Sequence, residues 1–82
     1  MADDGYVDRA TVLHVLRANR VVVSVQQGDM FLTVKGDISD IIPIPPECAR
    51  KLVRNLSRKF DIPIHQFYNP LMAPPLPGEK TQ

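Results

Sequence analysis

The chain of 82 residues carries ten basic and nine acidic side chains, a net charge of +1 and 44% apolar residues. This length supports one hydrophobic core, and the composition excludes a wholly disordered chain. The balanced charge gives no overall attraction to nucleic acid or membrane, and the single cysteine excludes an internal disulfide and a cysteine metal cluster. Because no apolar run approaches the roughly 20 residues of a membrane span, and the start lacks a signal-peptide core, we predict a cytoplasmic protein without membrane contact.

The chain is predicted to divide into three segments. We expect a flexible lead-in over residues 1–7, a single folded domain over residues 8–70 and a disordered tail over residues 71–82. The tail is inferred from its composition, because four of the eight prolines fall within residues 70–77 and no apolar period accompanies them.

The first predicted element is a helix over residues 9–19. Asp8 is a suitable N-cap, and apolar side chains recur behind it at helical spacing. Asn19 can end the helix in a left-handed conformation.

Two strands are expected next, joined by a tight turn. Residues 20–26 are rich in β-branched side chains, which favour a pleated sheet, and Gly28 can take the positive φ that a hairpin needs. Residues 30–35 then alternate, which is typical of a strand with two different faces. One face would hold Met30, Leu32 and Val34, and the other Phe31, Thr33 and Lys35.

A third strand is predicted over residues 38–44, after a reversal at Gly36-Asp37. Pro43 cannot donate a backbone hydrogen bond, so this strand should lie at an edge of the sheet or be ending there.

A basic amphipathic helix is predicted over residues 45–60. Pro45 and Pro46 are suited to its first turn, where Glu47 complements the helix dipole. Its apolar arc would comprise Ala49, Leu52, Val53, Leu56 and Phe60, and its basic arc Arg50, Lys51, Arg54 and Arg58. One more helical turn is expected over residues 64–68.

These elements, in the order helix, strand, strand, strand, helix, predict an α+β fold. The three strands would form an antiparallel sheet, and the apolar stripes of the two helices would pack on one face of it.

The basic arc is the first candidate site. Cationic side chains about one helical turn apart can lie along phosphates, so we predict RNA contacts by Arg50, Lys51, Arg54 and Arg58, extended by Lys35. The alternative is a solvated helix face on which Glu47 pairs with Lys51 or Arg54.

No catalytic, metal or cofactor site is predicted. His14 and His65 have no further ligands at metal-binding spacing, and both are expected to be packed or half-exposed. Cys48 opens the apolar side of the long helix and is interpreted as an inert core residue.

The open face of the sheet is the second candidate site. If Phe31 lies on the face away from the helices, it can stack on a base or on a partner's side chain. Together with Thr33, Ile41 and Pro43 it would make that face unusually apolar, which favours a homodimer or a protein partner.

The element order resembles the double-stranded-RNA-binding-like fold and, within it, the small HicA-type toxins, which are messenger-RNA interferases of toxin–antitoxin pairs. The resemblance spans about residues 11–67. It rests on the opening Val12-Leu13-His14-Val15-Leu16, the Gln26-Gln27-Gly28 strand end, the Ile42-Pro43-Ile44 strand end, the Arg58-Lys59-Phe60-Asp61-Ile62-Pro63 helix end and the final Gln66-Phe67.

The chain departs from this family at one chemically important position. The family has a histidine directly after a Gly-Ser pair at the start of the second strand, whereas this chain has Gly28-Asp29-Met30. The imidazole that would act as general acid or base is therefore missing. The resemblance thus implies an RNA-binding module without catalysis; the other hypotheses are a protein-interaction module and an active ribonuclease that uses His14 or His65.

Overall fold

The computed structural model describes residues 6–76 and has the predicted α+β architecture. Residues 1–5 of the expected lead-in and residues 77–82 of the expected tail lie outside the described residues. In chain order the elements are β1 (Val7–Asp8), α1 (Arg9–Ala18), β2 (Val22–Gln27), β3 (Met30–Lys35), β4 (Ile38–Pro43), β5 (Glu47–Cys48), α2 (Arg50–Phe60), α3 (His65–Tyr68) and the 3₁₀ helix η1 (Pro70–Met72).

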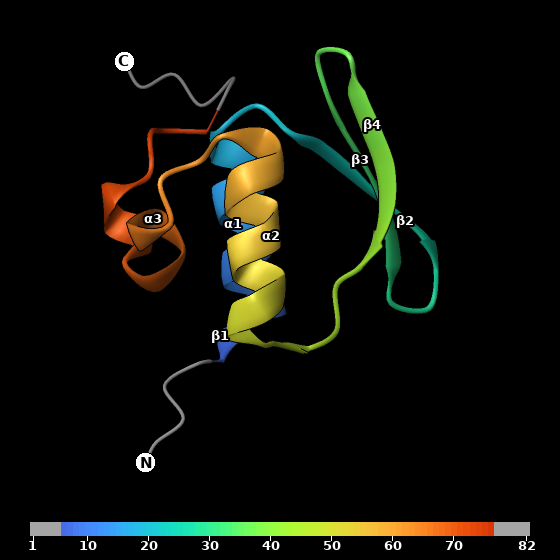
Figure 1. The fold of residues 1–82 in the computed structure, drawn as a ribbon, viewed down its shortest axis with the longest axis horizontal. Coiled ribbons are helices and arrows are strands. Elements are labelled where there is room, and N and C mark those ends of the chain that lie inside the picture. Colours follow the sequence, from blue (N-terminus) through green and yellow to red (C-terminus); the bar gives the residue numbers. More distant parts are fainter. Residues whose placement is uncertain (1–5, 77–82) are drawn as a thin grey trace.

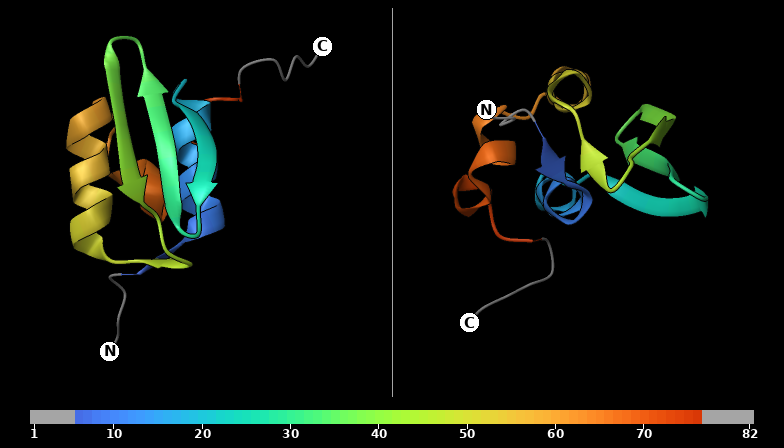
Figure 2. Two further views of the ribbon diagram at one scale, coloured as in Figure 1. Left: turned by 90° about the vertical axis from the view of Figure 1, so that its right-hand side faces the viewer. Right: turned by 90° about the horizontal axis from the view of Figure 1, so that it is seen from below.

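The main sheet is the predicted antiparallel meander, with strand order β2-β3-β4. Gly28 and Gly36 both have φ +59°, the left-handed conformation that the two tight turns require. The helices α1 and α2 run side by side behind one face of the sheet, and α3 lies on their far side (Figures 1 and 2). No described element covers the outer face of the sheet (Figure 2, left).

The core fills the space between the sheet and the two long helices. Thr33 is paired with Val23 across β2 and β3, and Phe31 with Ile42 across β3 and β4, and all four side chains are buried. The fully buried side chains from the helices and their flanks include Val12, Val15, Leu16, Val53, Leu56, Phe60, Ile62 and Phe67.

The prediction that placed Phe31 on the open face is therefore wrong, and so is that for Thr33. Both side chains point at the helices, because cross-strand partners share a face and their partners belong to the core. The open face instead carries the alternate residues of β3, which are Met30, Leu32 and Val34.

The long helix begins later than its sequence indicates. Glu47 and Cys48 are not in its first turn but form β5, which pairs antiparallel with β1 through Val7 with Cys48 and Asp8 with Glu47. Extended backbone is needed for this pairing, so α2 starts at Arg50. Cys48 is fully buried as predicted, although it belongs to the strand rather than to the helix.

The helix ends also differ from expectation in detail. Asp8 occupies the N-cap of α1, but its side chain makes no capping hydrogen bond. At the other end Arg20, with φ 69°, takes the left-handed conformation that was expected at Asn19. The side-chain amide of Asn19 instead donates to the carbonyl of Val15 and to Gln66 Oε1, each at 2.8 Å.

Regular structure reaches slightly past both predicted domain limits. Val7, assigned to the lead-in, is buried and paired with Cys48. Beyond residue 70, the turn η1 continues to Met72. The folded part of the chain is thus a little longer than residues 8–70.

Candidate functional site

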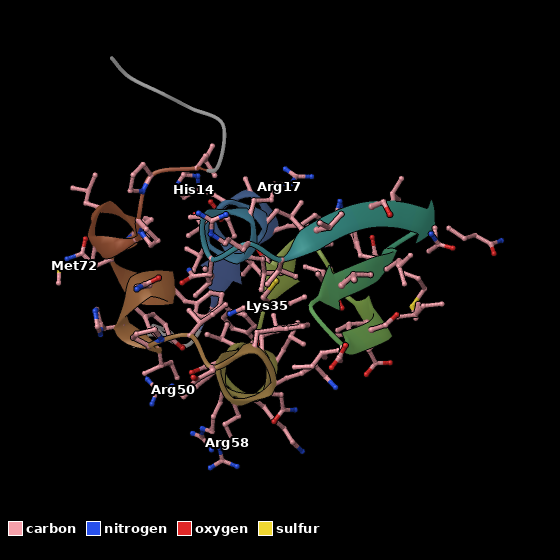
Figure 3. All side chains as sticks on the ribbon, turned by 90° about the horizontal axis from the view of Figure 1, so that it is seen from above. His14, Arg17, Lys35, Arg50, Arg58 and Met72 are labelled. Carbon is pink, nitrogen blue, oxygen red and sulfur yellow. The ribbon has the colours of Figure 1, made fainter. Side chains whose placement is uncertain are left out.

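Helix α2 separates an apolar side from a cationic side. Its inner residues Val53, Leu56 and Phe60 are buried against the sheet and α1, which fixes the direction of the opposite side. On that side Arg50, Lys51, Arg54 and Arg58 are all exposed, as predicted. We call these four residues the cationic face. Arg58 and Arg50 project outward from α2 in Figure 3.

The cationic face is not neutralised within the described part of the chain. The ion pairs found among residues 6–76 are Arg9 with Asp29 at 2.7 Å and Lys59 with Asp40 at 2.9 Å. Glu47 takes part in neither, so the alternative pairing of Glu47 with Lys51 or Arg54 is not formed there. Arg50, Arg54 and Arg58 follow each other at intervals of about 6 Å along the helix axis, which makes a cationic stripe.

Lys35 lies apart from the cationic face. It is on the inner side of β3, and its Nζ donates a hydrogen bond of 2.9 Å to the carbonyl oxygen of Phe60 at the C-terminal end of α2. The side chain points in between α1 and α2 (Figure 3). A cation at this helix end is stabilised by the helix dipole, so Lys35 has a structural partner before any ligand binds.

The histidines and the cysteine form no site with each other. His14 lies on the exposed side of α1, and His65 is exposed at the start of α3. Burial raises the pKa of the Cys48 thiol to about 11, which disfavours the reactive thiolate. Within the described residues no group of three or more His, Cys, Asp or Glu side chains could hold a metal ion.

The outer face of the sheet forms an uncharged apolar surface. Val22, Met30 and Ile41 expose 66%, 37% and 50% of their surface. Leu32 and Val34 lie between them and are partly buried. We call this surface the open face; it also includes Ser24, Ser39 and Pro43 by register. Its apolar character, and the places of Ile41 and Pro43 on it, agree with the sequence prediction.

A groove that the sequence does not predict lies beside the first residues of β2. It has a volume of about 500 Å³ and is lined by Arg17, Arg20, Val21, Val22, Val23 and Leu76. Arg17 is exposed on α1, and only the tertiary structure brings it close to the first residues of β2 and to Leu76.

Comparison of the chain with known protein families, with curated proteins and with solved structures finds no match. None of the helices between residues 6 and 76 is long and apolar enough to cross a membrane.

Proposed function

We propose that the protein is an RNA-binding module that resembles HicA-type toxins and double-stranded-RNA-binding-like domains but does not cleave RNA. The observation that carries this proposal is the cationic face, with four exposed basic side chains on a helix whose other side is anchored in the core. Because these side chains have no acidic partner among the described residues, phosphate binding breaks no ion pair within that part of the chain. The choice of RNA over DNA rests on the resemblance.

The absence of catalysis is inferred from the position at which the family has its histidine. Here that position is Met30, the first residue of β3, whose thioether cannot exchange a proton at neutral pH. Asp29, just before it, is held by Arg9 in an ion pair of 2.7 Å. The neighbouring groups therefore supply no replacement for a neutral imidazole.

The proposal is tested by binding of a fluorescently labelled RNA hairpin, measured by anisotropy at several salt concentrations. Four phosphate contacts predict that log K falls with log salt at a slope of about −3 to −4. Arg54→Glu should weaken binding by about tenfold or more and make the slope shallower by about one unit. Arg17→Glu is the matched control, since it changes the net charge equally on an exposed position of α1.

Equal affinity of Arg54→Glu and the natural sequence would refute RNA binding by the cationic face. An equal loss in Arg17→Glu would show that net charge, rather than this face, governs binding. Messenger RNA that is degraded on expression in cells would contradict the non-catalytic part of the proposal.

The open face supports a second candidate function, self-association of two copies. A two-fold symmetric contact sets one surface against itself, and an uncharged surface meets no like-charge repulsion there. We expect a dimer by sedimentation equilibrium and a monomer for Ile41→Lys, which places a charge on the open face at a half-exposed site. A monomer for the natural sequence at high micromolar concentration would exclude this function.

A further inference from the structure

The two outer edges of the main sheet differ in how they are protected. The β4 edge contains Pro43, which has no N–H to donate, and Asp40, which is paired with Lys59 of α2. The β2 edge, residues 22–27, has the sequence Val-Val-Ser-Val-Gln-Gln and contains neither proline nor charge. Its register with β3 is regular over residues 22–25 and shifts between Val25 and Gln27. Exposed strand edges in stable proteins are normally blunted by such residues or covered. Residues 22–25 of the β2 edge are therefore chemically ready to pair with another strand.

The groove beside the β2 edge indicates what kind of strand fits. Its apolar lining comes from Val21, Val22, Val23 and Leu76, of which Val22 is largely exposed whereas Val21 and Val23 are buried in the core. Both of its charged lining residues, Arg17 and Arg20, are cationic. Neither arginine belongs to an ion pair within residues 6–76. Figure 3 shows Arg17 on the side of the molecule where β2 forms the margin of the sheet. A ligand here meets backbone donors and acceptors, an apolar wall and positive charge together.

We propose that the β2 edge binds an extended acidic segment of a partner protein, which adds a fourth strand to the sheet. Backbone hydrogen bonds to β2 would supply affinity, and apolar side chains at alternate positions would pack beside Val22, the exposed valine of the groove. Carboxylates of the segment would pair with Arg17 and Arg20. The site is separate from the cationic face, because its arginines belong to α1 and the connection to β2 rather than to α2.

Charge decides between this partner and two others. A nucleic acid would engage the arginines but would leave the row of β2 backbone groups unpaired, since it offers no peptide ladder. A second copy of this chain, paired through its own β2 edge, would bring two further arginines to the same contact, and Asp29 at the adjacent hairpin is already held by Arg9. An acidic peptide satisfies both the edge and the charge.

The test uses the full chain labelled with ¹⁵N and a synthetic octapeptide of alternating glutamate and valine, acetylated and amidated at its ends. We expect chemical-shift changes on β2 and its flanks, and slower hydrogen exchange for those β2 amides that point away from β3. Arg17→Glu should weaken peptide binding by about tenfold or more, because a charge-assisted contact is replaced by repulsion. Arg54→Glu, with the same change of net charge, should bind the peptide like the natural sequence.

Two control peptides separate strand addition from simple charge attraction. An octapeptide of alternating lysine and valine should not bind, and a glutamate-valine peptide methylated on every backbone nitrogen should lose binding because it cannot donate to β2. Binding of either control with unchanged affinity would overturn the proposal. So would shift changes confined to α2, or an RNA hairpin that gives the same exchange protection on β2. Failure of RNA to bind the cationic face would leave this outcome unaffected.

Discussion

The two edges of the sheet show how the same kind of strand can be closed off or left available. At β4, the helix α2 packs alongside the strand, so that a smaller groove is lined by Ile42 and Pro43 on one side and by Leu52 and Leu56 on the other. Lys59 reaches from α2 to Asp40 across this edge. At β2 the adjacent helix α1 contributes Arg17 to the lining of the larger groove. Among the described residues, no residue of β2 takes part in an ion pair.

The difference follows from where each helix ends relative to the sheet. α2 is connected to the core along its inner side, by Val53, Leu56 and Phe60, and at its C-terminal end by the bond from Lys35 to Phe60. Its outer side is consequently free for another role, for which we propose RNA binding. α1 is followed closely by β2, and the chain reverses between them at Arg20, which has a left-handed conformation. α1 therefore does not extend along the outer edge of β2. Helix α2 thus covers the β4 edge and also presents the cationic face, whereas α1 leaves the β2 edge uncovered.

The largest contrast between the two edges should appear in how far a substitution on each side of the sheet lowers the free energy of unfolding. Phe60→Ala removes a core ring of α2, the helix that packs alongside β4; the ring is 1% exposed, and we expect the free energy of unfolding to fall by about 3 to 5 kcal/mol. Val25→Ala, at a 62% exposed site on β2, should change it by less than about 0.5 kcal/mol. Urea denaturation followed by circular dichroism measures both.

Because Phe60→Ala could unfold so small a domain outright, Phe60→Leu provides a milder test of the same position. It should fall between the natural sequence and Phe60→Ala. Losses of similar size for Val25→Ala and Phe60→Leu would contradict the view that the β2 edge carries little of the folding energy.

The fold could be predicted from the sequence because its signals are local. Alternation in β3, the turn glycines and the apolar spacing of α2 each depend on residues within a few positions of one another. They yielded the order of elements, the antiparallel sheet and the direction of the cationic face. The ladder between Val7–Asp8 and Glu47–Cys48 could not be found in this way, since two residues of strand carry no period and their partner is about forty residues distant.

Local sequence patterns also could not decide which face of β3 packs against the core. Phe31 and Thr33 alternate with Met30, Leu32 and Val34, and both sets are apolar enough to face a core. Pairing with the buried residues Val23 and Ile42 settles the choice, and pairing is a tertiary property. The groove at β2 escaped prediction for the same reason, because it needs α1, β2 and Leu76 to meet.

A smaller effect should distinguish Lys35, which has a structural partner, from the basic residues of the cationic face. Lys35→Met removes the hydrogen bond of 2.9 Å to the Phe60 carbonyl and should cost about 1 kcal/mol of stability. Its effect on the salt slope of RNA binding should be slight, because the ammonium group already has a partner. Lys51→Met, at an exposed site of the cationic face, should leave stability within about 0.5 kcal/mol and make the salt slope shallower by about 0.7 to 0.9. The reverse pattern would place Lys35 in the RNA site.

The smallest expected effect concerns the ion pair between Lys59 and Asp40 at the β4 edge. The hydrogen bond from Lys59, the backbone N–H of Ile41 and the charge of Lys59 together hold the pKa of the Asp40 carboxyl below its usual 3.8. Because the folded-state pKa is lowered, this contribution to stability is complete above pH 3.8 and is lost as the pH falls through the folded-state pKa. An NMR titration of the Asp40 carboxyl carbon should show a midpoint below 3.8 that rises in Lys59→Met, while Arg9→Met, which breaks the other ion pair, should leave it unchanged. A midpoint in the natural sequence that matches that of Lys59→Met would mean that Lys59 does not hold Asp40 in solution, and that Pro43 and the packing of α2 keep this edge from pairing without the ion pair.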